Sequence, residues 1–420
     1  MKALYFDIIN RSFETRLKRY VGMGFFEDGA KLSFDFAPLD DIDEGIQRLA
    51  DQCFGDRNTL VPHVPWLLTS ADRAWHFGLA IGTRDVDTKW SSDVIDWQRQ
   101  HSPGGNTAFI GGYLEAVRRQ SMTEFGKLVQ TIADDSILQG LLTAIVARTG
   151  GVADSVDHIT RLLEKNEIPV ESLTSLRYMH NVTAIAEHVF IRWIELLRQA
   201  GGNEHLGLAL SFLFGRFKEE SSRPIPAQLI ANFLADSTVI KMVRDSRTGQ
   251  ENYEYNWGKL LELLTEDHQT LAVSVARAFF ESFLQEPEAF NTRPGDAIDE
   301  SVWRVLELQP QAAWSAFFDV LRFAEGKQIY EMFHWLGAKS YYSDGTNLGL
   351  WPTVPEPMLW QWIDEELPER VELVANQLPL LVTEYGLTTI TCHFLRRYTR
   401  FTEACDCLVG TRVPGGVEGS

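Results

Sequence analysis

Apolar residues recur with a helical period along most of the chain, and the clearest example lies between residues 355 and 398. Leu359, Trp362 and Ile363 take the spacing that gathers apolar side chains on one face of a helix, and Pro368 follows as a stop. A second helical pattern runs from Glu369 to a stop at Pro379, and a third runs over residues 387–398. This alternation of helices and proline-marked breaks is typical of a stacked helical-repeat array.

The same period predicts a train of helices upstream of this stretch. Most tryptophans, including Trp75, Trp360 and Trp362, fall at inward positions of these helices, where they would fill the seams between stacked neighbours. In the helix that begins at residue 70, Leu79 and Ile81 are predicted to face inward with Trp75. The sequence therefore predicts an all-α fold, an α-solenoid of stacked helix pairs of the HEAT or TPR kind. The predicted helices cover residues 45–54, 58–68, a segment from residue 70, 91–100, 106–119, 121–134, 136–148, 154–166, 182–199, 203–219, 226–236, 257–265, 268–285, 297–308, 310–323 and 327–337.

Breaks in the pattern suggest how the chain is organised. Residues 1–39 are the least regular part and predict a small irregular N-terminal segment, whereas residues 40–220 predict a first helical-repeat array. A linker-like run rich in serine and proline begins at residue 221, so residues 221–409 predict a second array. Residues 410–420 are rich in glycine and predict a flexible tail.

Composition narrows the class of protein. The chain has 420 residues, 45% of them hydrophobic and 23% charged, which is typical of a protein with a packed core. Its formal net charge of −19 disfavours general affinity for nucleic acid or anionic lipid, because phosphate binding needs clustered Lys and Arg. No apolar stretch approaches the length of a membrane-spanning helix, and the N-terminus is not typical of a signal peptide. These features predict a cytoplasmic protein that does not bind membranes.

Three of the four cysteines lie close together near the C-terminal end of the sequence, which raises the hypothesis of a zinc site. Cys392 precedes a histidine, and Cys405 and Cys407 lie close behind. Structural zinc knuckles place two residues between paired cysteines, whereas one residue separates Cys405 from Cys407. Four cysteines in all are also too few and too clustered for a disulfide scaffold. The pattern predicts neither a metal nor another cofactor.

Candidate catalytic groups are equally sparse. His180 and His188 flank Glu187, but zinc-protease chemistry needs two histidines four residues apart with a glutamate directly after the first. The chain also lacks a phosphate-binding glycine-rich loop and a nucleophile elbow. No catalytic residue is therefore predicted, and the sequence favours a protein without enzymatic activity.

The C-terminal third resembles a known class of helical array. Residues 360–365 and 368–379 resemble a HEAT-type helix pair, and residues 394–398, 407–411 and 415–420 resemble late segments of arrays in large bacterial proteins. Those arrays often follow a nucleoside-triphosphatase module, as in STAND/NACHT-type anti-phage defence proteins. This chain lacks such a module. The resemblance implies the sensing or scaffold portion of a larger protein, or a separate relative.

The favoured hypothesis is a non-enzymatic α-solenoid that binds another protein. An acidic concave surface would select partners with basic faces through charge complementarity. The loops over residues 245–252 and 340–355 are the predicted contact segments, because exposed tyrosine and tryptophan are common interface anchors. In the alternative, these aromatic residues hold the loops against the array. The predicted protein-binding residues are Tyr253, Tyr341, Tyr342 and Trp351.

Two other functions stay open at this point. An all-helical enzyme could assemble its site from residues distant in sequence, around His180, Glu187 and His188. Such an enzyme would show a deep pocket with converging titratable groups, whereas a broad surface lined by acids and aromatic residues would favour binding. A structural component of a phage or its host is the third hypothesis.

Overall fold

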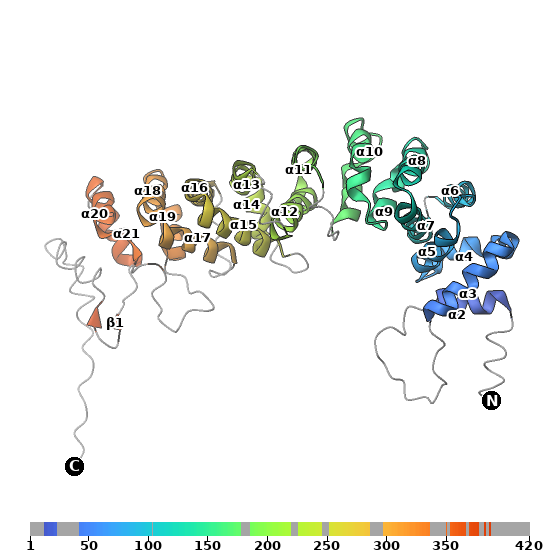
Figure 1. The fold of residues 1–420 in the computed structure, drawn as a ribbon. Helices are drawn as coiled ribbons and strands as arrows, with labels where there is room; N and C mark the ends of the chain where they lie inside the picture. Colours follow the sequence, from blue (N-terminus) through green and yellow to red (C-terminus); the bar gives the residue numbers. More distant parts are fainter. Residues whose placement is uncertain are drawn as a thin grey trace, which may run out of the picture. The chain divides into compact units, whose positions relative to one another are not determined.

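The computed structural model describes most of the chain as packed helices (Figure 1). The all-α helical-repeat fold predicted from the sequence is confirmed. Within the described residues, the exception to helical structure is a short antiparallel ladder between β1 (Val382–Thr383) and β2 (Gly386–Leu387). The described residues are 12–22, 42–102, 104–177, 185–219, 226–245, 252–285, 297–336, 350, 353–366, 369–377, 382–383 and 386–387.

The chain divides into two compact units, Met1–Glu220 and Ser221–Ser420, which are called unit 1 and unit 2 below. In unit 1 each helix packs against the next one or two along the chain. Its helices are α2 (Phe13–Val21), α3 (Ile42–Gly55), η1 (Arg57–Thr59), η2 (Val61–His63), α4 (Val64–Ser70), α5 (Ala74–Arg84), α6 (Ser91–Gln100), α7 (Ala108–Gln120), α8 (Met122–Ala133), η3 (Gln139–Leu141), α9 (Leu142–Ala147), α10 (Val152–Glu164), η4 (Val170–Leu176), α11 (Glu187–Ala200) and α12 (Gly202–Glu219).

Within residues 1–39 the structure describes one helix, α2. Its N-terminus is closed by a capping box, in which the Ser12 side chain accepts the Thr15 N–H and the Thr15 hydroxyl oxygen accepts the Ser12 N–H. Leu17 and Val21 are fully buried. Helix α2 therefore forms the first layer of unit 1, packed against α3.

A buried polar turn connects α5, α6 and α7 in unit 1. The Asp85 carboxylate accepts the backbone N–H groups of Lys89 and Trp90 at 2.8 and 2.7 Å, and the Tyr113 hydroxyl donates to it at 2.6 Å. Burial and the neighbouring Asp85 carboxylate raise the pKa of Tyr113 well above its ordinary value. Because both oxygens of the Asp85 carboxylate accept hydrogen bonds, the side chain can lie in the core without an unsatisfied acceptor.

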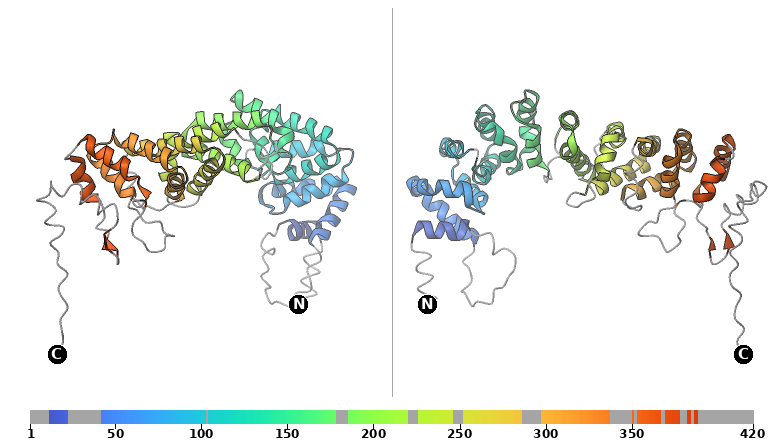
Figure 2. Two further views of the ribbon diagram at one scale, coloured as in Figure 1. Left: turned by 60° about the vertical axis from the view of Figure 1, so that its left-hand side comes forward. Right: turned by 180° about the vertical axis from the view of Figure 1, so that it is seen from behind.

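Unit 2 is a two-layered array (Figure 2). One layer contains α13, α16, α18 and α20, the other contains α15, α17, α19 and α21, and α14 packs against α15 and α16. The helices are α13 (Ala227–Leu234), α14 (Ser237–Asp245), α15 (Tyr253–Asp267), α16 (Gln269–Gln285), α17 (Ala297–Leu308), α18 (Pro310–Leu321), α19 (Gly326–Leu336), α20 (Glu356–Glu365) and α21 (Glu369–Gln377).

The core of unit 2 is strongly aromatic. Trp335 of α19 lies 5.5 Å from Phe279, 5.8 Å from Phe280 and 6.0 Å from Phe283 between ring centroids, so one indole contacts three phenylalanines of α16. Tilted and edge-to-face geometries of this kind add to the burial of apolar area. Trp335 therefore fills a seam between helices, as its position in the sequence predicts. Trp193, Trp257 and Trp314 are fully buried and fit the same prediction.

Several predicted elements differ from the observed ones. The helix predicted over residues 58–68 is two short 3₁₀ turns followed by α4, because Pro62 and Pro65 interrupt the helical hydrogen bonds. The helix predicted over 136–148 is shorter, with α9 beginning at Leu142, and α14 was not predicted. Of the helix predicted over 387–398, Leu387 belongs to β2 and the remainder lies outside the described residues, as does the predicted tail.

Candidate functional site

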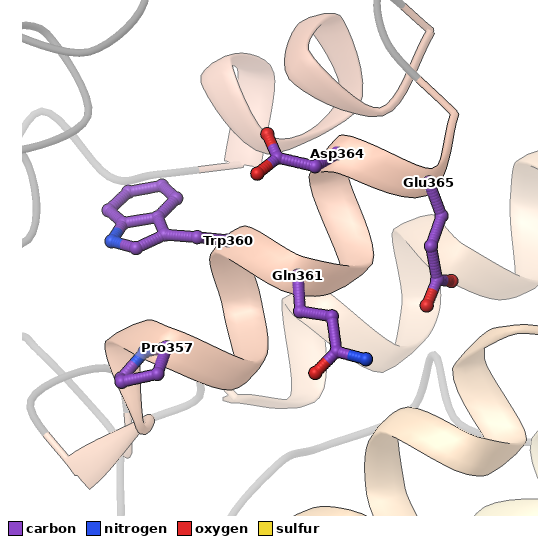
Figure 3. A pocket seen from close by; sticks show the side chains of 5 residues that line it. All are labelled: Pro357, Trp360, Gln361, Asp364 and Glu365. Atoms are coloured by element: carbon purple, nitrogen blue, oxygen red, sulfur yellow. The ribbon is translucent and has the colours of Figure 1, made fainter.

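The strongest candidate for a binding site is a shallow, open hollow on α20 (Figure 3). It is lined by Pro357, Trp360, Gln361, Asp364 and Glu365. These residues recur at three- and four-residue steps, so they form one stripe of a single helix. The proline occupies the first turn of α20, where a missing N–H leaves no helical hydrogen bond unmade.

The opposite stripe of α20 fixes the helix in unit 2. Leu359, Trp362 and Ile363 are fully buried, as their spacing predicts. The Trp362 ring meets Phe333 of α19 edge to face, with 5.6 Å between centroids. Full burial of three large apolar side chains contributes roughly 5 kcal/mol of hydrophobic free energy, which is enough to hold one short helix in place. The hollow is therefore presented by a fixed surface.

Two arginines connect α20 to its neighbours through Glu365. Arg322 of α18 lies 3.2 Å and Arg370 of α21 lies 3.1 Å from the Glu365 carboxylate. The Arg370 guanidinium also lies 4.4 Å above the Trp362 ring, and it pairs with Glu366 at 3.1 Å. Glu365 is thus a structural carboxylate at the edge of the hollow, with its charge balanced by two guanidinium groups.

The ionisation of Glu365 follows from these contacts. Burial raises the pKa of the carboxyl, but hydrogen bonds and charge from Arg322 and Arg370 act in the opposite direction and are together larger. The pKa of Glu365 consequently lies below its ordinary value. The carboxylate is ionised at neutral pH.

Of the remaining polar groups of the hollow, Asp364 lies toward Trp360 and Gln361 lies toward Glu365. Figure 3 shows the Asp364 carboxylate directed to the same side of the helix as the Trp360 indole. Asp364 is exposed, whereas Trp360 is only 8% exposed and forms a wall. Between residues 356 and 372 the sequence has six carboxylates and one arginine. The hollow therefore joins an aromatic wall to a negatively charged rim.

The residues predicted to contact a partner have different positions. Tyr253 is the first residue of α15 and is only 6% exposed. It is therefore not an exposed anchor, and its burial fits the alternative in which the aromatic ring holds the loop against the array. Tyr341, Tyr342 and Trp351 lie outside the described residues.

The helix ends that flank both predicted contact loops meet in one buried cluster. Arg244, in the last turn of α14, lies 4.4 Å above the Phe279 ring and 3.9 Å from Asp299 of α17. Asp299 accepts the indole N–H of Trp335, in the last turn of α19, at 2.9 Å. The ends of the chain around residues 337–349 also meet, because the Leu350 N–H donates to the Leu336 carbonyl at 2.8 Å. In unit 2, the helix ends next to both predicted contact segments are thus held by the Arg244–Asp299 pair and the Trp335 indole.

The residues considered for catalysis are not assembled in the described part of the chain. Glu187 and His188 are exposed in the first turn of α11, and His180 lies outside the described residues. Among the described residues, no group of three or more His, Cys, Asp and Glu side chains could hold a metal ion. Cys392, Cys405 and Cys407, the thiols considered for zinc, also lie outside them. No described helix has both the length and the apolarity to cross a membrane.

The comparisons with known proteins give no relative. No protein-family model matches the chain, no curated protein matches it, and no solved structure matches it.

The hydrophobic pattern predicts an inward Trp360, which is confirmed because its side chain is only 8% exposed, but it does not predict that Trp360, Gln361 and Asp364 line a hollow. Two exposed tyrosines of unit 2 were also missed: Tyr255 on α15 is 47% exposed and Tyr330 on α19 is 45% exposed, stacked on a histidine one turn further. For the hollow, the sequence signal is the stripe of α20 opposite its apolar face, which carries Pro357, Gln361, Asp364 and Glu365.

Proposed function

We propose that the chain is a non-enzymatic helical-repeat scaffold or sensor that binds another protein through a basic surface of that partner. The observation that carries this proposal is the hollow on α20, where an indole, an amide and two carboxylates share one face of a firmly packed helix. A shallow surface with an aromatic wall and a charged rim is typical of protein recognition, whereas small-molecule chemistry usually takes place in a deeper pocket.

The charge of unit 2 supports a basic partner. Residues 221–420 include 28 Asp and Glu against 16 Lys and Arg. Complementary charge accelerates association and disfavours acidic partners such as nucleic acid. Exposed Tyr255 and Tyr330 on the layer of α15 and α19, and the loop residues Tyr341, Tyr342 and Trp351, are further proposed contacts.

The resemblance to anti-phage defence proteins adds a more specific proposal. The partner would be a protein that is present or altered during phage infection, and the chain would act as the recognition region in the bacterial cytoplasm. This part of the proposal rests on the sequence resemblance.

The test uses the full chain as bait in bacterial cells with and without phage infection, followed by quantitative mass spectrometry. Gln361→Arg places a positive charge in the hollow, whereas Gln311→Arg makes the same change at an exposed position in the first turn of α18. A stoichiometric basic partner should be retained by Gln311→Arg and lost with Gln361→Arg. Replacement of residues 340–355 by Gly and Ser tests the loop contacts in the same way.

Two results would contradict the proposed function. Absence of any stoichiometric partner in both conditions would exclude binding of a cellular or phage protein. Equal capture by the unaltered chain, the Gln361→Arg variant and the loop replacement would show that neither proposed surface contributes.

A further inference from the structure

A tryptophan and an acid four residues apart occur twice in the segment of α20 and its C-cap residue, Glu366. Trp362 and Glu366 are four residues apart and together hold Arg370, whose guanidinium lies 4.4 Å above the indole and 3.1 Å from the carboxylate. Trp360 and Asp364 are also four residues apart, and both line the hollow. A tryptophan and an acid at this spacing lie on one face of a helix, so a planar cation can stack on the indole while it pairs with the carboxylate.

Unit 1 contains a third trio of this kind. The Arg57 guanidinium lies 4.8 Å above the Trp90 ring and pairs with Asp93, three residues after the tryptophan. Arginine suits this arrangement better than lysine, because its planar guanidinium stacks on an aromatic face and also donates two parallel hydrogen bonds to a carboxylate. The chain thus holds two of its own arginines between a tryptophan and an acid three or four residues later, at the C-terminal end of α20 and at the N-terminal end of α6.

We propose that Trp360 and Asp364 bind an arginine side chain of the partner protein. This inference rests on the proposed function and names the chemistry that the hollow recognises. The aliphatic part of the arginine lies along Pro357, and the guanidinium lies against the indole with the Asp364 carboxylate as its acceptor. A carboxylate offers about four acceptor sites, so it can accept from a guanidinium besides a contact that it already makes.

The other lining residues have supporting roles. Gln361 is exposed in the middle of the stripe, and its amide can both donate to and accept from the backbone of a bound segment. Glu365 pairs with Arg322 and Arg370 and forms one edge of the hollow, so we assign Asp364 as the main acceptor for the partner's guanidinium. The acidic surroundings from residue 356 to 372 favour an approaching cation and disfavour an approaching acid.

The experiment follows the indole N–H signals of isotope-labelled tryptophan in the full chain by NMR. The signal lost in Trp360→Phe is assigned to Trp360. The probes are short capped Gly/Ser peptides with a central arginine pair, a lysine pair, or a pair of citrullines, which are neutral isosteres of arginine. We expect a saturable shift of the Trp360 signal with the arginine peptide, a weaker one with the lysine peptide and none with the citrulline peptide.

Variants separate the site from general electrostatics. Asp364→Asn should weaken the affinity for the arginine peptide by about threefold, which is the effect of one exposed ion pair. Added salt should reduce the difference in affinity between this variant and the unaltered chain. Glu307→Gln removes the same charge from an exposed position on α17, outside the acidic segment 356–372, and should leave affinity within about 1.5-fold, because an exposed charge outside the site contributes little. Equal weakening by both variants, or a Trp360 signal that does not respond, would overturn the inference.

Other occupants of the hollow give distinct results. Residues 395–400 of the sequence include three arginines, Arg396, Arg397 and Arg400. Stronger peptide binding by an Arg396→Glu, Arg397→Glu double variant would assign the hollow to this basic stretch of the chain itself. A Trp360 signal that changes with protein concentration before peptide is added would assign the hollow to a second copy. Either result overturns the inference. Partner capture that depends on Gln361 without any arginine response would leave the proposed function intact, whereas an arginine response without any captured partner would contradict the proposed function.

Discussion

Gly112 of α7 lies directly against Trp75 of α5 in unit 1. A Cβ atom built on Gly112 would lie 1.9 Å from the Trp75 carbonyl oxygen, and one built on Gly78 would lie 2.1 Å from the Phe109 carbonyl oxygen. Real Cβ atoms essentially never approach a neighbour so closely. The two helices therefore cross backbone to backbone, at a separation that only glycine permits.

Replacement of Gly112 by alanine should destabilise unit 1. The added methyl group would push α5 and α7 apart and disturb the core around them, so we expect a loss of about 3 kcal/mol in the free energy of unfolding. Urea denaturation followed by circular dichroism measures this loss. Gly126→Ala on α8 is the matched control, because no atom lies within 4 Å of a Cβ built there, and it should stabilise the chain by up to about 1 kcal/mol. Equal stability of Gly112→Ala and the unaltered chain would contradict the close crossing.

This crossing also shows why the faces of α5 were incompletely predicted. The helical period placed Trp75 and Leu79 toward the core, but both are partly exposed, and Gly78 and Gly82 are buried in their place. Glycine has no apolar side chain, so a hydrophobic pattern gives it no weight although it allows the closest helix packing. By contrast, α6 and α17 have the predicted bounds, because their faces alternate between apolar and charged residues.

The candidate site was harder to predict than the fold for a related reason. Sequence reasoning places tryptophan in helix seams, which holds for Trp362 but does not reveal that Trp360 lines a hollow. Whether part of a mostly buried tryptophan lines a hollow depends on what packs around its helix, here α18, Phe333 of α19 and Arg370 of α21. Likewise, the polar loop before Tyr253 predicts an exposed ring, whereas Tyr253 is only 6% exposed at the start of α15.

Asp135 should make the stability of unit 1 sensitive to acid. Its carboxylate accepts from Arg99 at 2.7 Å and from the Ile137 N–H at 2.8 Å, and the side chain is 13% exposed. Burial raises the pKa of Asp135, but the hydrogen bonds and the Arg99 charge together lower it by more. The pKa in the folded state therefore lies below the ordinary 3.8. A lowered pKa stabilises the fold at every pH above 3.8, and this contribution is lost as the pH falls through the folded-state value.

The Asp135→Asn variant tests this contribution. It should lower the free energy of unfolding at neutral pH by about 1 kcal/mol, because a neutral amide is a weaker acceptor for Arg99, and its stability should decline less steeply in acid. Denaturation at a series of pH values measures both effects. Asp157→Asn removes the same charge from an exposed position on α10 and should keep the acid-dependent decline of the unaltered chain. An unchanged decline in Asp135→Asn would contradict the assignment.

Cys53 should resist alkylation in the folded chain. The thiol is fully buried on α3, and burial, with a smaller effect of the Asp56 charge, raises its pKa to about 12. Since the thiolate is the reactive form, only about one thiol in ten thousand is ionised near pH 8. Iodoacetamide followed by mass spectrometry should leave the Cys53 peptide unmodified in the native chain and modify it in urea. Native labelling at the rate of a small thiol would show that α3 is not packed as described.

Arg370 should contribute strongly to the stability of unit 2. Its side chain is 6% exposed, and its guanidinium donates to the Trp362 carbonyl at 2.5 Å besides its ion pairs with Glu365 and Glu366. Methionine at this position keeps an apolar chain over the indole but leaves the carbonyl and both carboxylates without this donor. Because the carboxylates are partly exposed, we expect a loss near the lower end of the range for buried pairs, about 2 kcal/mol.

A double-mutant cycle isolates the part of this loss that belongs to the Arg370–Glu366 pair. Arg370→Met, Glu366→Gln and the double variant are compared by urea denaturation. The sum of the two single losses in the free energy of unfolding should exceed the loss in the double variant by about 0.5 kcal/mol or more. Arg304→Met, at an exposed position on α17, controls for the change in net charge and should be nearly neutral. Additive losses would show that the tryptophan–acid pair of α20 does not hold its own arginine. The inference that Trp360 and Asp364 bind an arginine of the partner would then lose its physical basis.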